Sequence, residues 1–161
     1  MPARTLAVAA FALMAVLSLT GCDALLGGEE VARIPLKRNA DGGYVPVRIR
    51  LSADMSPVAF TLLADFAWGK REEHGRWNTY RVTLRGSNGT TRSEEFHVNS
   101  PEAPPVASSP PPSSLVQPML LVDIPADGEY EIEVAVVKPA EVTLEGEQLG
   151  VRMHVPRLPR F

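Results

Sequence analysis

The chain has 161 residues, which is enough for one domain of ordinary size and little more. Its 16 lysine and arginine residues against 19 aspartate and glutamate residues give a formal charge of -3, which excludes a globally basic nucleic-acid-binding protein. Its 15 prolines and 12 glycines are too many for a protein of long helices, and they favour short strands joined by turns.

The N-terminal segment, residues 1–21, has the pattern of a secretory signal peptide. Arg4 lies in a short first region, residues 6–17 form an apolar core, and mostly small residues follow at 18–21. The core is shorter than the roughly 20 apolar residues that a membrane-spanning helix requires. A cleaved signal is therefore favoured over a transmembrane helix.

The signal peptide ends at the only cysteine of the chain, within the sequence Leu19-Thr20-Gly21-Cys22. This motif resembles the lipobox of bacterial lipoproteins. The resemblance implies that Cys22 receives diacylglycerol on its thiol, becomes the first residue after cleavage, and carries a further acyl chain such as palmitate on its amine. Two or more acyl chains hold a protein stably on a lipid bilayer. The alternative is an ordinary signal peptide with a chance cysteine nearby.

The same resemblance predicts where the protein resides. A lipoprotein of this type is anchored in the cell envelope and faces the periplasm. Asp23 follows the cysteine, and in enterobacterial lipoproteins an aspartate there retains the protein in the inner membrane, so this membrane is favoured over the outer one. Lipidation leaves no thiol for a disulfide, a thiolate metal site or cysteine catalysis. We expect a tether over residues 22–32 and one domain over residues 33–161.

Alternating apolar residues predict strands at residues 34–36, 44–51 and 58–66. In the second of these, Val45 is expected to point into the core and Tyr44 outward, while Pro46 indicates a sheet edge because proline has no N–H to donate. The third is apolar enough for a helix, but its aromatic and β-branched residues favour a strand. Leu63 indicates partial cover of its second face.

A β-hairpin is predicted from residues 79–85 to 91–98, through the turn Gly86-Ser87-Asn88-Gly89. Residues 100–114 are mainly serine, proline and alanine, and they predict an exposed loop, for which a dispensable insertion is favoured over a functional segment. Further strands are expected at 115–124, 129–137, 142–144 and 149–155.

The strand at 129–137 carries Glu129, Glu131 and Glu133 on its outward face. We expect these glutamates to pair across neighbouring strands with outward arginines, namely Arg48, Arg50, Arg81 and Arg85. The sequence Asp127-Gly128-Glu129-Tyr130 resembles the start of a late strand in immunoglobulin-like sandwiches, where a tyrosine hydroxyl bonds back to the preceding corner. With about eight short strands, the predicted fold is all-β: an antiparallel β-sandwich, immunoglobulin-like or jelly-roll.

The sequence has few residues arranged for metal binding or catalysis. The three histidines, His74, His97 and His154, have no metal-ligand spacing, and no G-x-S-x-G nucleophile motif is present. We therefore expect no metal site, no cofactor and no enzymatic activity, and a hydrolase is the least favoured function.

The segment between Trp68 and Trp77 is the best candidate for binding. Its two tryptophans flank a charged run, in which the candidate contact residues are Lys70, Arg71, His74 and Arg76. Tryptophan and arginine are enriched at binding hot spots, so the segment suits a protein partner or a sugar. The alternative is that both tryptophans fold back to cover the ends of the sandwich.

Residues 44–155 resemble, without a diagnostic motif, small Gram-negative lipoproteins that carry a β-sandwich domain of unknown function. The resemblance implies no activity. We expect a membrane-anchored, non-enzymatic module that binds a protein partner in the periplasm, either as a structural component of the envelope or as an immunity-type protein that blocks a toxin. The alternative is a lipoprotein that binds carbohydrate or peptidoglycan through the Trp68–Trp77 segment.

Overall fold

The computed structural model describes residues 27–66, 77–99, 114–138 and 142–157. Residues 1–26, which include the predicted signal peptide and Cys22, and residues 67–76, 100–113, 139–141 and 158–161 lie outside the described residues. The predictions made for those positions, including the lipobox, most of the Trp68–Trp77 segment and all but the last residue of the Pro/Ser loop, are therefore not addressed by the fold.

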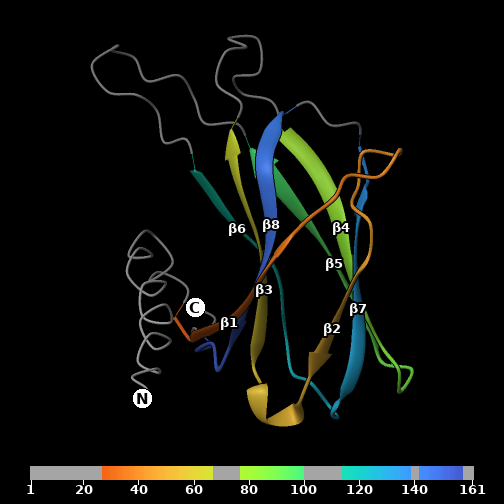
Figure 1. Ribbon diagram of the computed structural model, residues 1–161, viewed down its shortest axis with the longest axis vertical. Helices are drawn as coiled ribbons and strands as arrows, with labels where there is room; N and C mark the ends of the chain where they lie inside the picture. The colour runs from red at the N-terminus through yellow and green to blue at the C-terminus, as the bar shows by residue number, and fades with distance from the viewer. Residues whose placement is uncertain (1–26, 67–76, 100–113, 139–141, 158–161) are drawn as a thin grey trace, which may run out of the picture.

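Eight strands form two four-stranded antiparallel sheets that pack as a sandwich (Figure 1). The first sheet has the order β1 (Glu29–Pro35), β8 (Leu144–Met153), β3 (Val58–Phe66) and β6 (Ser114–Val122). The second has the order β2 (Val47–Leu51), β7 (Gly128–Val136), β4 (Trp77–Gly86) and β5 (Thr91–Asn99). The predicted antiparallel β-sandwich is confirmed.

Alternate residues of the facing strands fill the space between the sheets. Phe60 and Leu62 of β3 are fully buried, as are Tyr80 and Val82 of β4. Burying an apolar side chain of this size contributes roughly 1.5–3 kcal/mol, so this layer supplies most of the stability of the fold. The second face of β3 is covered as well, as predicted from the sequence: Leu63, which lies on that face, is only 8% exposed.

The predicted hairpin and the predicted tyrosine contact are both present. Strands β4 and β5 pair in register around the turn, where the Gly86 N–H donates to the Thr90 carbonyl at 2.8 Å and Gly89 has a φ of 83°. The Tyr130 hydroxyl donates to the Ala126 carbonyl at 2.7 Å. This bond closes the corner that leads into β7, as the resemblance to immunoglobulin-like sandwiches implied.

The orientation predicted for Tyr44 and Val45 is wrong. Tyr44 is 1% exposed and belongs to the core, whereas Val45 is 48% exposed. The strand begins only at Val47, because Pro46 cannot donate to a ladder and the two residues before it bond elsewhere: Tyr44 N–H donates to Val134 O and Val45 N–H to Lys37 O. Strand β2 does lie at a sheet edge, as Pro46 indicated.

Two predicted boundaries also change. Strand β1 begins at Glu29, so residues 29–32, which were expected in the tether, belong to the first sheet. Strand β8 is continuous where two separate strands were expected. Gly146 has a φ of 63° and lies beside a register shift between β3 and β8. This local bulge allows the strand to continue past a glycine that would otherwise favour a turn.

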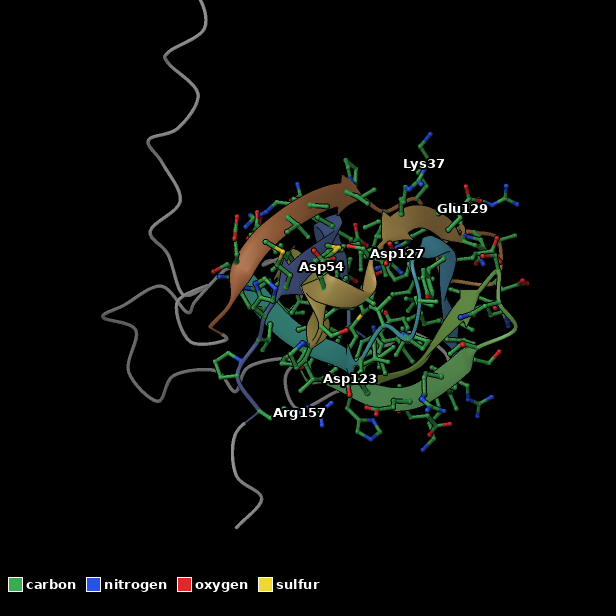
Figure 2. All side chains as sticks on the ribbon, turned by 90° about the horizontal axis from the view of Figure 1, so that it is seen from below. Lys37, Asp54, Asp123, Asp127, Glu129 and Arg157 are labelled. Atoms are coloured by element: carbon green, nitrogen blue, oxygen red, sulfur yellow. The ribbon has the colours of Figure 1, made fainter. Side chains whose placement is uncertain are left out.

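The sandwich has two distinct ends. At the proximal end the described chain begins at Gly27, near the one-turn helix η2 (Ala53–Met55), the connection 123–127 and residues 154–157 (Figure 2). At the distal end lie the connection 36–46 and the residues that border the three internal undescribed segments (Figure 1). Those bordering residues are Phe66, Trp77, Asn99, Ser114, Lys138 and Val142.

Candidate functional site

The predicted binding segment departs from and returns to the distal end. Of its candidate residues, Trp68, Lys70, Arg71, His74 and Arg76 lie outside the described chain. Trp77 is the first residue of β4, opposite Asn99 of β5. Because β3 ends at Phe66, both attachment points of the segment are at the same end of the sandwich.

A buried asparagine fastens the described part of this end. Asn78 is fully buried, and its side-chain amide donates to the Val142 carbonyl at 2.9 Å and to the Tyr80 hydroxyl at 3.0 Å. Its side-chain oxygen accepts from the Val142 N–H at 2.9 Å. The start of β4 is thereby joined to the residues that lead into β8, across 64 positions of sequence.

Three aromatic rings lie beneath these bonds. Tyr80 stacks on Phe96 with ring centroids 5.3 Å apart, and its other neighbour is Tyr44 at 6.1 Å. All three are buried. We call Tyr44, Asn78, Tyr80 and Phe96 the distal platform; it is a packed and bonded support for the loops at this end.

An ion pair closes the platform on one side. Arg38, in the connection from β1 to β2, pairs with Glu147 of β8 at 2.5 Å, and its guanidinium lies 5.3 Å from the centroid of the Tyr44 ring. Burial lowers the pKa of Arg38, but Tyr44 and Glu147 outweigh it and the pKa is raised overall. The arginine is therefore a permanently charged contact that holds two elements together.

Tyr44 carries the one buried side-chain polar atom without a hydrogen bond among the described residues, its hydroxyl oxygen. Burial raises the pKa of Tyr44 well above its ordinary value of 10.0, with a further contribution from Tyr80 and an opposing one from Arg38. The hydroxyl stays protonated at neutral pH. Its role in the platform is packing.

The described histidines do not converge. The His97 ring shares a hydrogen bond of 3.0 Å with the Thr79 hydroxyl near the distal end, whereas His154 contacts the Asp54 carbonyl at the proximal end. Within the described ranges, no group of three or more histidine, cysteine, aspartate or glutamate residues is placed to hold a metal ion.

The predicted pairing of the three glutamates of β7 with arginines is confirmed on the outer face of the second sheet for two of the four arginines, Arg48 and Arg85. Arg85 pairs with Glu133 at 2.6 Å and Arg48 with Glu131 at 3.4 Å. Arg81 pairs instead with Glu95 of the neighbouring strand at 2.6 Å. Exposed pairs of this kind contribute about 0–1 kcal/mol each, and they leave this face largely neutral.

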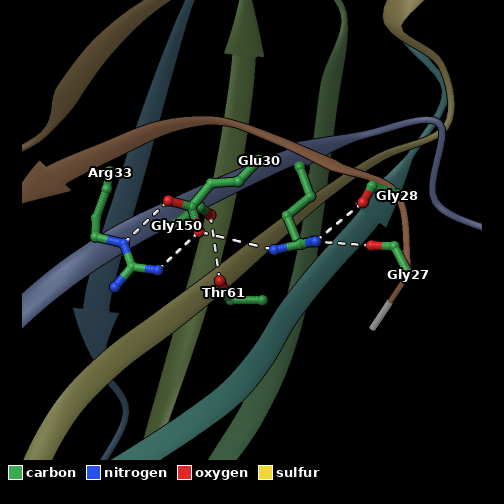
Figure 3. Close-up of polar contacts among 7 residues, drawn as sticks. Gly27, Gly28, Glu30, Arg33, Thr61 and Gly150 are labelled. Atoms are coloured by element: carbon green, nitrogen blue, oxygen red, sulfur yellow. Dashed lines mark hydrogen bonds and ion pairs between the residues drawn. The ribbon is translucent and has the colours of Figure 1, made fainter. Parts of the chain in front are cut away.

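A polar cluster at the proximal end was not foreseen from the sequence. The side chain of Arg152 in β8 is 12% exposed, and it donates to the carbonyls of Gly27 at 2.8 Å and Gly28 at 2.9 Å (Figure 3). Glu30 lies 3.7 Å from the same guanidinium and pairs with Arg33 at 2.7 Å. The two adjacent glycines were the only local sign that the chain is held there.

No helix within the described ranges is long and apolar enough to span a membrane. Comparison of the chain with protein-family models, with curated protein sequences and with solved structures found no match.

Proposed function

We propose that this chain is a bacterial lipoprotein whose acylated Cys22 holds a β-sandwich at a membrane of the cell envelope, and that the distal end of the sandwich binds a protein partner in the periplasm. The observation that carries the proposal is that two parts of the chain join the sandwich at opposite ends. The chain arrives from residue 26 at one end, and the Trp68–Trp77 segment is attached at the other end.

The residues at the distal end support a binding role for that end. At the distal end, the side-chain polar groups of Asn78 and Tyr80 are used in bonds within the fold, which suits a rigid support for a binding loop. The attached segment combines two tryptophans with Arg71 and Arg76, and both residue types are enriched at protein interfaces. A protein partner is favoured over a sugar because arginine and tryptophan occur together in one short segment.

The membrane part of the proposal is tested by fractionating cells that produce the full chain. The unaltered protein is expected in the membrane fraction, and Cys22→Ser is expected to leave the signal peptide uncut. Efficient processing and unchanged membrane retention of Cys22→Ser would contradict lipidation.

The binding part is tested with the detergent-extracted lipoprotein as bait for envelope proteins. We expect a partner retained in a fixed ratio, lost with Trp68→Ala or Arg71→Glu, and kept with the control Arg48→Glu, which reverses the same charge on the outer face of the second sheet. Loss with all three variants, or with none, would contradict a distal binding surface. Retention on peptidoglycan that Trp68→Ala abolishes would replace the protein partner by a carbohydrate.

A further inference from the structure

The chain enters the sandwich through two glycines in a conformation that other residues rarely adopt. Gly27 and Gly28 have φ angles of 65° and 70°. A Cβ atom on Gly27 would lie 2.8 Å from Pro156 Cδ, and one on Gly28 would collide with the carbonyl oxygen of Met153. Both the backbone direction and the available space therefore require glycine here.

Arg152 locks these two residues to strand β8. Its guanidinium donates to both glycine carbonyls and lies near Glu30, and its side chain is largely buried. Charge-assisted bonds of this kind are stronger than neutral ones. We call Gly27, Gly28 and Arg152 the tether clamp, because it fixes the position at which residue 26 joins the domain.

The distance from the clamp to the acylated residue is short. Only residues 23–26 separate Cys22 from Gly27, so a fully extended chain spans at most about 18 Å between them. Strand β4 has 10 residues and runs from the distal end toward the proximal end, which corresponds to about 30 Å. The tether is therefore too short for the inverted orientation, in which the distal end faces the lipid and the clamp lies about 30 Å above it.

We propose that the tether clamp fixes the orientation of the sandwich on the membrane, with the proximal end facing the phospholipid headgroups and the distal end directed away from them. This inference rests on the proposed lipidation of Cys22. It adds that orientation is set by the fold and is not left to a flexible linker.

Electrostatic attraction is not the source of this orientation. The proximal end carries Asp54, Asp123 and Asp127 (Figure 2), of which Asp123 is paired with Arg157. Anionic lipids attract basic segments and repel carboxylates. Because these carboxylates do not attract the domain to an anionic bilayer, the covalent connection through Cys22 is what holds the proximal end near it.

The orientation is measured with the full-length lipoprotein in vesicles that contain an energy-acceptor lipid. Lipidation consumes the only native thiol, so a single introduced cysteine takes the donor dye. Ser87→Cys, exposed in the hairpin at the proximal end, and Asp41→Cys, exposed in the distal connection 36–46, provide the two positions. We expect strong energy transfer from residue 87 and weak transfer from residue 41.

The clamp is tested by adding Arg152→Gln to each labelled protein. Because β1 still pairs with β8 from Glu29 onward, this variant frees only Gly27 and Gly28, and the difference between the two positions is expected to decrease in part. The control Arg33→Gln removes the same charge from β1 and is expected to keep the full difference. If Arg152→Gln does not fold, a flexible insertion of about ten glycine and serine residues after residue 26 serves instead, since it leaves every clamp contact in place and removes the short connection.

Equal transfer from both positions in the unaltered protein, or an unchanged difference in Arg152→Gln and in the insertion variant, would overturn the proposed orientation. The mass of the N-terminal peptide separates this failure from failure of the proposed function. An acylated Cys22 with equal transfer refutes only the orientation, and an unmodified Cys22 refutes the anchor itself.

Discussion

At the scale of single residues, two buried tyrosines of similar exposure play different parts. Tyr130 donates its hydroxyl to the Ala126 carbonyl, whereas the Tyr44 hydroxyl has no hydrogen bond. A buried polar group without a partner loses its bonds to water and gains nothing in return. Tyr44 is therefore held in the core by its ring, through contacts with Tyr80 and Arg38.

Tyr44→Phe is expected to leave the free energy of unfolding at neutral pH unchanged within about 0.5 kcal/mol, or to raise it slightly. The matched control Tyr130→Phe removes a hydrogen bond and is expected to lower it by about 1 kcal/mol. Urea denaturation of both variants measures the difference. Similar losses in the two variants would show that the Tyr44 hydroxyl does make a bond.

Alkaline pH gives a second test of Tyr44. Because burial raises the pKa of Tyr44 in the folded state, the unfolded chain releases this proton first, near the ordinary value of 10.0. Its contribution to stability is full below that pH and falls above it, by at most about 1.4 kcal/mol per pH unit. The fall between pH 10 and 11 should be smaller in Tyr44→Phe, and an identical fall would contradict a raised pKa.

At the scale of strands, Asn78 joins two elements at the distal end that are 64 positions apart in the sequence. It supplies both the donor and the acceptor for Val142, where the chain approaches β8. Removing it leaves two buried backbone groups unpaired, each at a cost of about 1–3 kcal/mol. The distal loops depend on this contact for a fixed base.

Asn78→Ala is expected to lower the free energy of unfolding by about 3 kcal/mol and to speed amide hydrogen exchange at Val142. The control Asn39→Ala removes an asparagine whose side-chain oxygen accepts from the Asp41 N–H in an exposed turn, and it should cost less than about 1 kcal/mol. If exchange at Val142 is as slow in Asn78→Ala as in the unaltered protein, Asn78 does not fasten this end.

Contacts that follow from strand alternation or from a local motif could be predicted from the sequence, and other contacts between distant segments could not. Period-two patterning placed the outward glutamates beside arginines, and a local motif predicted the Tyr130 bond. The pair Arg38–Glu147 joins residues 109 positions apart, and the Arg152–Gly27 bond spans 125. The orientation of Tyr44 was predicted wrongly because the regular alternation of the strand begins only after Pro46.

At the scale of the whole molecule, we propose an anchor at one end of a rigid sandwich and a binding surface at the other. In this proposal the packed core makes the domain a spacer of fixed length, and the tether clamp gives the spacer a direction. A partner would then meet the Trp68–Trp77 segment at a set height above the bilayer. Every part of this arrangement depends on the acylation of Cys22.

The most direct measurement is the mass of the N-terminal peptide of the protein purified from membranes. We expect a mature chain that starts at Cys22 and carries diacylglycerol on the thiol. Its amine is expected to carry an additional acyl group or, in lineages without that second acylation, to be free. A mature chain that starts elsewhere, or one that carries an unmodified Cys22 thiol, would contradict the account.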